Sequence, residues 1–469
     1  MKFVGREEEL SRLEEWWSSD PWMGLIWGRR RVGKTALISR FLADKRAVFY
    51  TGRGVTAAAE LRQFSNRVAS VLHTDQRDLA TSDPFQTWDE ALDHLADLAM
   101  SEPMVLALDE FPELLKAEPA LPGILRAFWD RWEGRTELKI LLCGSAVRAM
   151  FALQTAREPL YGRFGLSLQL HPMAPFEAAQ LLPDLEPAAR AAAFGICGGM
   201  PLHLAMWDQN GSLEDNLSTL VCRPGAALKT EAEFVLHTEA GEGGLPEAVL
   251  QSIAQGHTKF SEIQTAVGTN PTRTLERLEE LRLIRAVIPV TESTRTRRRH
   301  YQITDNLLAF YLGPLSLFAD EIELGSGDQI VAPLAASLPE NFGRAYEEAV
   351  RMHLRRLAVA GELGDRVVKI GSWWGKAGQN EIDLVVLAQP DRTRVPILVG
   401  EVKWARSVNA SRLKTRLAGK VPELIGDSGV EPKFLIAARE EVTGGDDETY
   451  RLTAADVFST DLRPLSLCD

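Results

Sequence analysis

Short apolar runs alternate with helical patterns along the first part of the chain. The runs lie at 25–27, 47–50, 104–108 and 139–143, and each is bounded by glycine, proline or charged residues. Apolar runs of this length, separated by helical stretches, are typical of strands in a mostly parallel sheet with helical crossovers. Residues 1–175 are therefore predicted to form an α/β core. The Ala- and Leu-rich stretch 176–240 predicts a small helical lid.

The pattern changes in the second half of the chain. Residues 241–324 contain helical patterns and then two β-rich stretches, 284–290 and 300–303, on either side of a basic tip; this order predicts a winged helix-turn-helix. Residues 325–339 contain several turn-forming residues and predict a linker. Residues 340–469 predict a second α/β unit, with a helix at 341–360 and strands near 367–374, 381–388, 395–405 and 433–438.

Composition and charge narrow the classes of protein. A length of 469 residues suggests about three domains, and 45% hydrophobic with 25% charged residues excludes a wholly disordered chain, a collagen-like repeat and a coiled-coil rod. A net charge of −12 excludes a uniformly basic nucleic-acid coat but leaves local basic patches open. The four cysteines lack Cys-x-x-Cys spacing, which favours buried thiols over zinc sites or disulfides. No apolar run approaches the roughly 20 residues of a membrane span, so we expect a cytoplasmic protein without a membrane partner.

The strongest chemical signal is a glycine-rich phosphate-binding loop. Residues 28–35 read Gly-Arg-Arg-Arg-Val-Gly-Lys-Thr and match Gly-x4-Gly-Lys-Ser/Thr at every fixed position, between a predicted strand and a predicted helix. The glycines let backbone N–H groups turn toward phosphates, Lys34 is expected to reach the β- and γ-phosphates, and Thr35 to hold Mg²⁺. The residues expected to bind ATP here are Gly28, Arg31, Val32, Gly33, Lys34 and Thr35.

Acidic and polar residues follow two of the later strands. Asp109 and Glu110 follow the run 104–108, at the edge where open α/β sheets bind ligands. Asp109 is expected to bind Mg²⁺ through its water shell, and Glu110 to polarise the attacking water. Ser145 either senses the γ-phosphate or forms a simple turn. Arg163 either acts as an arginine finger or forms a surface ion pair.

These motifs occur in an order that resembles the archaeal-type ATPases, a group of AAA- and STAND-related P-loop NTPases. The matching segments are 3–10 (Phe-Val-Gly-Arg-Glu-Glu-Glu-Leu), the phosphate loop, 108–110 (Leu-Asp-Glu), 144–145 (Gly-Ser), 160–163 (Leu-Tyr-Gly-Arg), 198–202 (Gly-Gly-Met-Pro-Leu) and 301–305 (Tyr-Gln-Ile-Thr-Asp). The resemblance implies an α/β P-loop NTPase core with a helical lid, a winged helix over 241–324 and a restriction-endonuclease-like domain over 340–469. It also implies that Gly5 and Arg6 lie near the adenine base, and that a homo-oligomer is one of the assemblies to expect.

A basic tip is the candidate nucleic-acid contact of the predicted winged helix. Arg295 and the run 297–299 lie at this tip, and Arg273 lies on the helix before it. Several such arginines would bind nucleic-acid phosphates in a salt-dependent, sequence-independent way. The alternative is a solvated hairpin or a packing adaptor. Trp373 and Trp374, near the C-terminal site, either stack on bases or belong to the core.

A second candidate site lies in the C-terminal unit. Glu401 and Lys403 are two residues apart on a predicted strand and therefore share one face. If the preceding hairpin centres near Arg392, Asp383 lies opposite Glu401, at about 5 Å. Two carboxylates and a lysine placed in this way fit Mg²⁺-dependent cleavage of a phosphodiester. The alternative is a salt bridge between Lys403 and its acidic neighbours.

Asp followed by Glu-x-Lys also resembles the active site of the restriction-endonuclease-like proteins. That resemblance implies a further acid on the opening helix, which is Glu347, with Glu348 as the less favoured register. The metal ligands expected are then Thr35 and Asp109 at the first site, and Glu347, Asp383 and Glu401 at the second.

The sequence as a whole predicts an ATP- and Mg²⁺-dependent ATPase coupled to a nuclease-like domain that binds nucleic acid, with DNA as the expected partner. The alternative is a nucleotide-dependent switch. In that case the phosphate loop sets a conformational state, and the C-terminal domain binds nucleic acid or a partner without cleaving it.

Overall fold

A computed structural model divides the chain into two compact units, Met1–Pro172 and Met173–Asp469. The structure describes residues 3–20, 22–72, 79–80, 83–240, 243–364, 366–376, 378, 380–390, 393–426 and 430–468. Each unit has its own sheet and its own buried core. Within the described residues, no helix has both the length and the apolar character that a membrane span requires.

The first unit contains a five-stranded parallel sheet in the order β2-β3-β4-β1-β5. Its strands are β1 Met23–Trp27, β2 Ala47–Thr51, β3 Met104–Asp109, β4 Leu138–Gly144 and β5 Leu166–Gln169. Its helices are α1 Glu7–Trp17, α2 Lys34–Phe41, α3 Ala57–Val71, α4 Trp88–Leu98, α5 Phe111–Ala117, α6 Leu121–Trp132 and α7 Val147–Ala152. The four apolar runs are β1 to β4, as predicted, and the parallel α/β core is confirmed.

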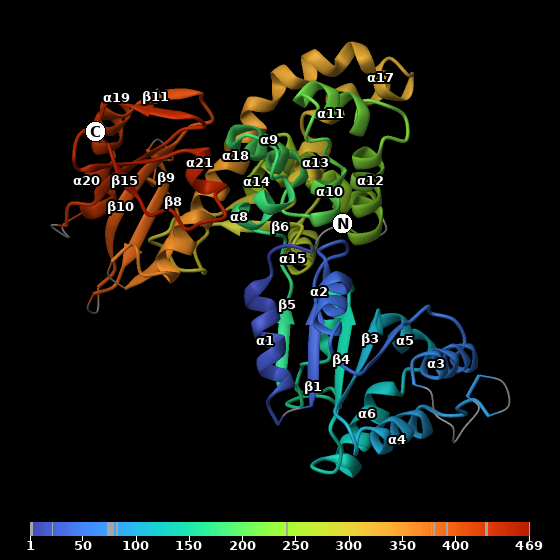
Figure 1. Cartoon of the computed structure of the whole chain (residues 1–469). Helices are drawn as coiled ribbons and strands as arrows, with labels where there is room; N and C mark the ends of the chain where they lie inside the picture. The colour runs from blue at the N-terminus through green and yellow to red at the C-terminus, as the bar shows by residue number, and fades with distance from the viewer. Residues whose placement is uncertain are drawn as a thin grey trace. The chain divides into compact units, whose positions relative to one another are not determined.

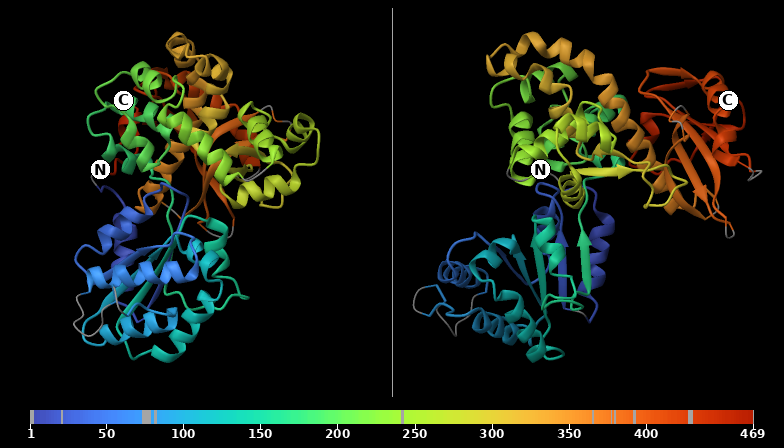
Figure 2. Two further views of the ribbon diagram at one scale, coloured as in Figure 1. Left: turned by 90° about the vertical axis from the view of Figure 1, so that its right-hand side faces the viewer. Right: turned by 180° about the vertical axis from the view of Figure 1, so that it is seen from behind.

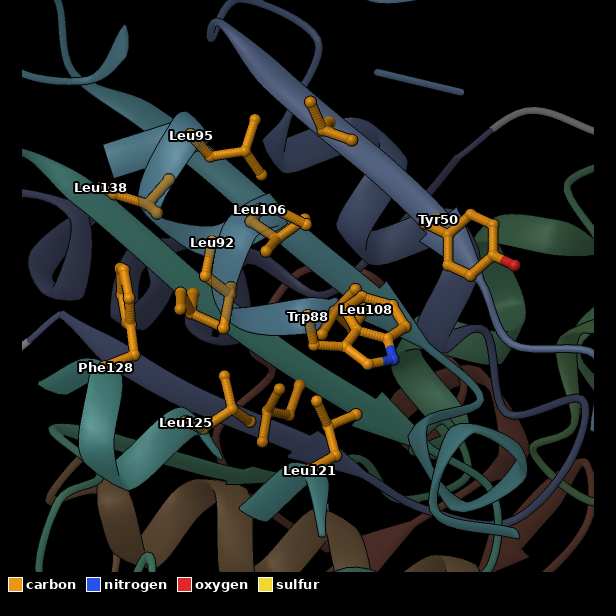
Figure 3. Packing of buried hydrophobic residues seen from close by; sticks show 14 of the residues in the cluster. Tyr50, Trp88, Leu92, Leu95, Leu106, Leu108, Leu121, Leu125, Phe128 and Leu138 are labelled. Atoms are coloured by element: carbon orange, nitrogen blue, oxygen red, sulfur yellow. The ribbon is translucent and has the colours of Figure 1, made fainter. Parts of the chain in front are cut away.

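Helices cover both faces of this sheet (Figure 1, Figure 2). Gly24 of β1 lies against Trp16 of α1, whereas Leu25 belongs to the core cluster that contains residues of α4 and α6. Figure 3 shows Leu92 of α4 close to Leu106 of β3 in this cluster. Burial on both faces explains why β1, β3 and β4 are continuous apolar runs, whereas the edge strands β2 and β5 alternate between more and less buried residues.

The second unit begins with helices and continues with a three-helix and hairpin part. The first helices are α8 Pro175–Ala178, the 3-10 helix η1 Ala179–Leu181, α9 Pro187–Cys197, α10 Pro201–Met206, α11 Leu213–Leu220 and α12 Ala227–Glu239. The next elements are α13 Gly244–Ala254, α14 Phe260–Val267, α15 Thr272–Glu280, the antiparallel strands β6 Ile284–Val287 and β7 His300–Ile303, α16 Asn306–Leu312, η2 Leu315–Phe318 and α17 Ala319–Glu323.

The stretch 325–339, predicted as a linker, lies mostly in the first half of a long helix, so that prediction is wrong. This helix, α18 Gly327–Val359, has 33 residues and includes Pro333 and Pro339. Leu334 and Leu338 are fully buried. Their packing stabilises a helix that the prolines, judged from sequence alone, would interrupt.

The unit ends with a six-stranded sheet in the order β15-β14-β12-β10-β9-β8. Its strands are β8 Val367–Trp374, β9 Glu381–Ala388, β10 Val395–Val402, β12 Lys433–Ala437, β14 Thr449–Leu452 and β15 Ser466–Leu467. The smaller elements around it are β11 Ser407–Asn409, α19 Ala410–Ala418, α20 Val421–Ile425, β13 Glu441–Thr443 and α21 Ala454–Val457. Strands β8, β9 and β10 are antiparallel, and β12 is parallel to β10.

The register of β9 and β10 places the C-terminal acids side by side. Gly400 pairs with Leu384, and continuing this register puts Asp383 opposite Glu401, as the sequence predicted. Arg392, the predicted centre of the hairpin, lies outside the described residues.

Candidate functional site

The phosphate-loop sequence forms a tight turn between β1 and α2. Arg31 and Gly33 have positive φ angles of 64° and 96°, and Gly33 caps the start of α2. A Cβ on Gly28 would lie 2.4 Å from the carbonyl oxygen of Leu170, so only glycine fits at the exit of β1. The loop therefore lies at the carboxyl end of the parallel strands, in front of a helix N-terminus.

Lys34 and Thr35 lie where the motif requires them. Lys34 Nζ donates hydrogen bonds to the carbonyl oxygens of Gly28 and Arg29, both at 2.9 Å, and the side chain is buried within the loop. Thr35 Oγ1 donates to Asp109 Oδ2 at 3.0 Å. A hydroxyl and a carboxylate are hard oxygen ligands of the kind that Mg²⁺ prefers. These residues therefore fit a nucleotide with its magnesium ion.

Glu110 is held by Ser145, which follows the neighbouring strand β4. Ser145 Oγ donates to Glu110 Oε2 at 2.8 Å, and the Ser145 N–H donates to the same oxygen at 3.3 Å. Glu110 has a positive φ of 47°, and its own N–H donates to Asp109 Oδ1 at 3.0 Å. Ser145 is therefore more than part of a turn, because it orients the acid that follows β3.

The N-terminal segment also contacts the phosphate loop. Arg6 donates hydrogen bonds to the carbonyl oxygens of Val32, at 3.2 Å, and His171, at 2.6 Å, and it pairs with Glu9 at 2.8 Å. Gly5 and Arg6 both have left-handed φ angles, 66° and 69°. This backbone turn places Arg6 beside the loop. The role of Gly5 and Arg6 near the adenine base remains a prediction.

Arg163 does not lie at this site within its own unit. It pairs with Asp130 of α6 at 3.4 Å and is two residues from Gly165, whose N–H donates to the carbonyl of Met23 at the start of β1. The phosphate loop follows the other end of β1, at Trp27. Five strand residues separate the two ends by about 15 Å. Of the two interpretations, the structure supports the ion pair.

The comparisons with known proteins agree with this geometry. Residues 3–206 match the family of ATPase domains found predominantly in Archaea. The first part of the chain is therefore similar to the archaeal-type ATPases. Residues 317–415 match a family of archaeal and bacterial proteins of unknown function.

Relatives and solved structures extend the similarity beyond the ATPase domain. An uncharacterized protein of Methanocaldococcus jannaschii is 26% identical over 412 residues, which are 86% of this chain and 87% of that protein. An uncharacterized ATP-binding protein of the same organism is 49% identical over 45 residues, 9% of this chain and 76% of that protein. The Walker-type ATPase of Pyrococcus abyssi is similar in structure, with a TM-score of 0.52 and 21% identity over 66% of this chain and 96% of that one. This last similarity shows the fold.

Outside the ATPase domain, the C-terminal sheet brings together two carboxylates and a lysine. Lys403 Nζ lies 3.2 Å from Asp383 Oδ2 and 2.8 Å from Glu401 Oε1, so the ammonium bridges the two acids. The N–H of Val402 donates to Asp383 Oδ2 at 2.9 Å. Each acid exposes only 14% of its side chain. These contacts are expected for a catalytic site and also for a cross-strand salt bridge, so they agree with both interpretations of the sequence.

The buried acids of this C-terminal site perturb one another. Burial and the neighbouring Glu401 charge raise the pKa of Asp383. Burial and the Asp383 charge raise the pKa of Glu347 to about 7. Burial by itself would lower the pKa of Lys403, but the charges and hydrogen bonds of Asp383 and Glu401 raise it above its usual value. Negative charge is therefore concentrated here and only partly neutralised by Lys403.

Arg351 of α18 is a site residue that the sequence interpretation missed. Its Nη1 donates to the backbone oxygen of Asp383 at 2.9 Å and lies 3.6 Å from Glu347 Oε2, while its Nε lies 2.9 Å from Glu348 Oε2. Glu348 also pairs with Arg285 and Arg355, and these partners hold its pKa well below the usual range although burial opposes the shift. The signal available in the sequence was that Arg351 follows Glu348 by three residues and Glu347 by four on one predicted helix.

The three predicted metal ligands of the C-terminal site are neighbours but not one cluster. Among the residues that the structure describes, no three His, Cys, Asp or Glu side chains are grouped as a metal site. Asp383 and Glu401 share Lys403, and Glu347 lies on the Asp383 side. Lys420, also missed, lies 3.4 Å from Glu401 Oε2.

The basic tip packs against the C-terminal sheet. The N–H of Val290, between β6 and β7, donates to the carbonyl of Ser372 in β8 at 2.9 Å. The side chain of Arg298 bonds to Glu292 and to the carbonyl oxygen of Trp374, and His300 stacks on Trp374 with ring centroids 4.7 Å apart. Because these contacts join the tip to the C-terminal sheet, they favour a packing adaptor over a solvated hairpin.

The predicted nucleic-acid contacts of the tip are therefore only partly available. Arg298 is engaged by Glu292 and β8, and Arg299 donates to carbonyl oxygens of its own loop. Arg273, Arg295 and Arg297 are exposed. Trp373 and Trp374 are 6% and 7% exposed, so they belong to the core and are not available for stacking on bases.

Proposed function

We propose that this protein hydrolyses ATP in its N-terminal domain and that its C-terminal carboxylate site acts on nucleic-acid phosphodiesters. The observation that carries the first activity is the pair of contacts from Thr35 to Asp109 and from Ser145 to Glu110. Together they place a metal-binding pair and an oriented acid at the edge of the sheet that carries the phosphate loop.

Each residue of the ATPase site has a role that follows from its position. The N–H groups of the loop and Lys34 bind the phosphates, and Thr35 and Asp109 hold the magnesium ion. When bound, Mg²⁺ neutralises charge on the phosphates. Glu110 orients the attacking water and accepts its proton, and Ser145 keeps the Glu110 carboxylate in place.

Two substitutions test the ATPase assignment. Lys34→Ala should abolish ATP binding and turnover. Glu110→Gln should keep ATP binding and slow hydrolysis by about 10²–10⁴-fold, the usual contribution of a general base. Binding is measured by calorimetry with a non-hydrolysable analogue, and turnover by phosphate release. Undiminished turnover in the Lys34 variant would contradict the assignment.

A phosphodiesterase activity is the second function, and the Asp383, Glu401 and Lys403 constellation favours it. The two acids provide oxygen ligands for a divalent cation, and Lys403 orients or activates water. A restriction-endonuclease-like domain over 340–469, with Glu347 as the helical acid, is the assignment that this constellation supports. The order of three helices and a β hairpin in α13–α15, β6 and β7 supports a winged helix.

A cleavage assay separates this activity from the alternative, a nucleotide-dependent switch. Plasmid, linear and single-stranded DNA and RNA are incubated with Mg²⁺ or Mn²⁺, with and without ATP. Asp383→Ala and Lys403→Ala should each abolish cleavage and leave ATP hydrolysis intact. The Lys34→Ala protein reports whether ATP controls cleavage. ATP hydrolysis with no cleavage of any substrate would favour the switch, and native mass analysis with ATP would test a homo-oligomer.

A further inference from the structure

A line of basic residues runs along α19 and ends at the C-terminal site. Arg412, Arg416 and Lys420 are spaced by four residues, and we call this line the α19 stripe. Each step of four residues advances about 6 Å along a helix and turns about 40° around it. Arg412 and Arg416 are exposed, whereas Lys420, just after the helix, is half-buried. The stripe therefore begins in solvent and ends against the sheet.

The two arginines of the stripe carry unneutralised charge. Neither guanidinium forms an ion pair or a hydrogen bond with any residue in the part of the chain that the structure describes. Other cations close by in the sequence are paired: Arg406 with Glu440 at 3.0 Å and Lys414 with Asp446 at 2.7 Å. The stripe is thus a local excess of positive charge in a protein whose net charge is −12.

Helix α19 covers the face of the sheet that carries Glu401. Leu417 of α19 packs in one core cluster with Val385 of β9 and Val399 of β10. Because side chains two residues apart on a strand share a face, Glu401 is on the face of Val399. The stripe and Glu401 are therefore on the same side of the sheet, and Lys403 connects Glu401 to Asp383.

The last residue of the stripe makes direct contact with the C-terminal site. Lys420 Nζ lies 3.4 Å from Glu401 Oε2 and donates to the carbonyl oxygen of Glu381 at 2.6 Å. Positive charge is consequently continuous from the exposed end of α19 to the carboxylates. A polyanion needs such charge here, because Glu381, Asp383 and Glu401 would otherwise repel its phosphates.

We propose that the α19 stripe is the surface along which a nucleic-acid backbone approaches the Asp383 and Glu401 site. The inference deepens the proposed phosphodiesterase function and rests on it. The stripe would bind the backbone phosphates of the nucleic acid, independently of its sequence. Exposed arginines in a row along a helix provide this kind of recognition.

The test compares two matched pairs of exposed arginines in the full-length protein. Arg412→Gln/Arg416→Gln removes the stripe, and Arg295→Gln/Arg297→Gln removes the exposed part of the basic tip. Binding of fluorescein-labelled 30-nucleotide single-stranded DNA, its duplex and an RNA of the same sequence is followed by anisotropy over a range of salt concentrations. Loss of the stripe should weaken binding several-fold at low salt and reduce the slope of log K against log salt by about one for each arginine.

Further controls separate loss of charge from loss of fold. Arg412→Lys/Arg416→Lys keeps the charge and should keep the salt slope of the wild type, and all variants should hydrolyse ATP at the wild-type rate. An unchanged slope in the stripe variant, a loss confined to the tip variant, or no binding of any probe by the wild type would each overturn the proposal. Salt-dependent binding through the stripe without cleavage would leave it standing and would contradict only the proposed phosphodiesterase activity.

Discussion

Ser145 and Glu110 follow neighbouring strands and are joined by a 2.8 Å hydrogen bond. A carboxylate accepting a bond from a hydroxyl loses rotational freedom, so Ser145 limits the positions that Glu110 can take. In the proposed mechanism this restriction keeps a general base ready for water, and Ser145 is then a positioning residue.

Removing the hydroxyl of Ser145 should therefore lower the rate of ATP hydrolysis more than it weakens binding. We expect Ser145→Ala to reduce kcat about tenfold, corresponding to the roughly 1.4 kcal/mol of one charge-assisted hydrogen bond, with KM nearly unchanged. Ser145→Thr, which keeps a hydroxyl, should retain most of the rate. Steady-state phosphate release measures both constants, and a raised KM with an unchanged kcat would contradict the positioning role.

Sequence reasoning at the residue scale succeeded where the chemistry is contiguous. Residues 28–35 form one local turn, so their spacing already determines which atoms can converge. Arg163 shows the limit of this reasoning. Its role depends on which end of the sheet the loop after α7 reaches, and no local pattern encodes that. Arg351 was missed because an arginine three or four residues after an acid is also common on exposed helix surfaces.

Helix α18 owes its length to buried side chains rather than to helix propensity. Leu338→Ala should destabilise the second unit by about 2–5 kcal/mol, because its side chain is fully buried between two prolines of the helix. Val359→Ala, at the exposed end of the same helix, is the matched control and should change the stability by less than about 0.5 kcal/mol. Urea unfolding followed by circular dichroism measures both, and equal effects would contradict the packing argument.

His353, also on α18, should make the second unit sensitive to acid. Burial lowers the pKa of His353 to about 4 from its usual 6.5. Between these values the unfolded chain binds a proton that the folded chain does not, so stability falls as pH falls from 6.5 to 4, by up to about 3 kcal/mol. Well above pH 6.5 His353 is neutral in both the folded and the unfolded chain, so it does not contribute to the pH dependence of the unfolding free energy.

The matched substitution His353→Gln should flatten this part of the pH dependence. Unfolding free energies at pH 7.5 and 4.5 should differ less in the variant than in the wild type. His257→Gln, at an exposed position of the same unit, should leave the difference unchanged. An identical pH dependence in wild type and His353→Gln would contradict the prediction, because it would show that the imidazole takes up its proton at the same pH in the folded and unfolded chains.

At the scale of elements, continuous apolar patterns in the sequence were easier to interpret than interruptions of a pattern by polar residues or prolines. The apolar runs of β1 to β4 were predicted, whereas β5 was missed because the polar residues Ser167 and Gln169 alternate with its two buried leucines. The linker prediction failed because Pro333 and Pro339 are ordinary turn signals in sequence, while burial of their neighbours depends on elements distant along the chain. The pairing of Asp383 with Glu401 was predicted from the position of the turn, although the structure shifts the register by one residue between Pro396 and Leu398, so turn length by itself does not determine which residues are opposite.

At the scale of the whole molecule, two compact units predict two unfolding transitions. Because the phosphate loop lies in Met1–Pro172, ATP with Mg²⁺ should raise the midpoint of one transition and leave the other in place. Saturation at about 100 times Kd should stabilise that unit by about 2.7 kcal/mol. Differential scanning calorimetry with and without ligand measures the shift. Lys34→Ala is the control and should show none, and a shift of both transitions would indicate that the units unfold together.

Helix α18 also constrains how this protein can change over evolutionary time. Asn341 Nδ2 donates to the carbonyl of Gly195 in α9 at 3.3 Å, and Phe342 packs tightly on Gly195, while the next turn of α18 carries Glu347 toward Asp383. A recombination event that exchanged the C-terminal sheet would have to cut this continuous helix and expose one of its two buried faces. The helical part and the carboxylate site should therefore be inherited as one block, and a stable fragment that contains the sheet should also contain α9 and α11, which pack against α18.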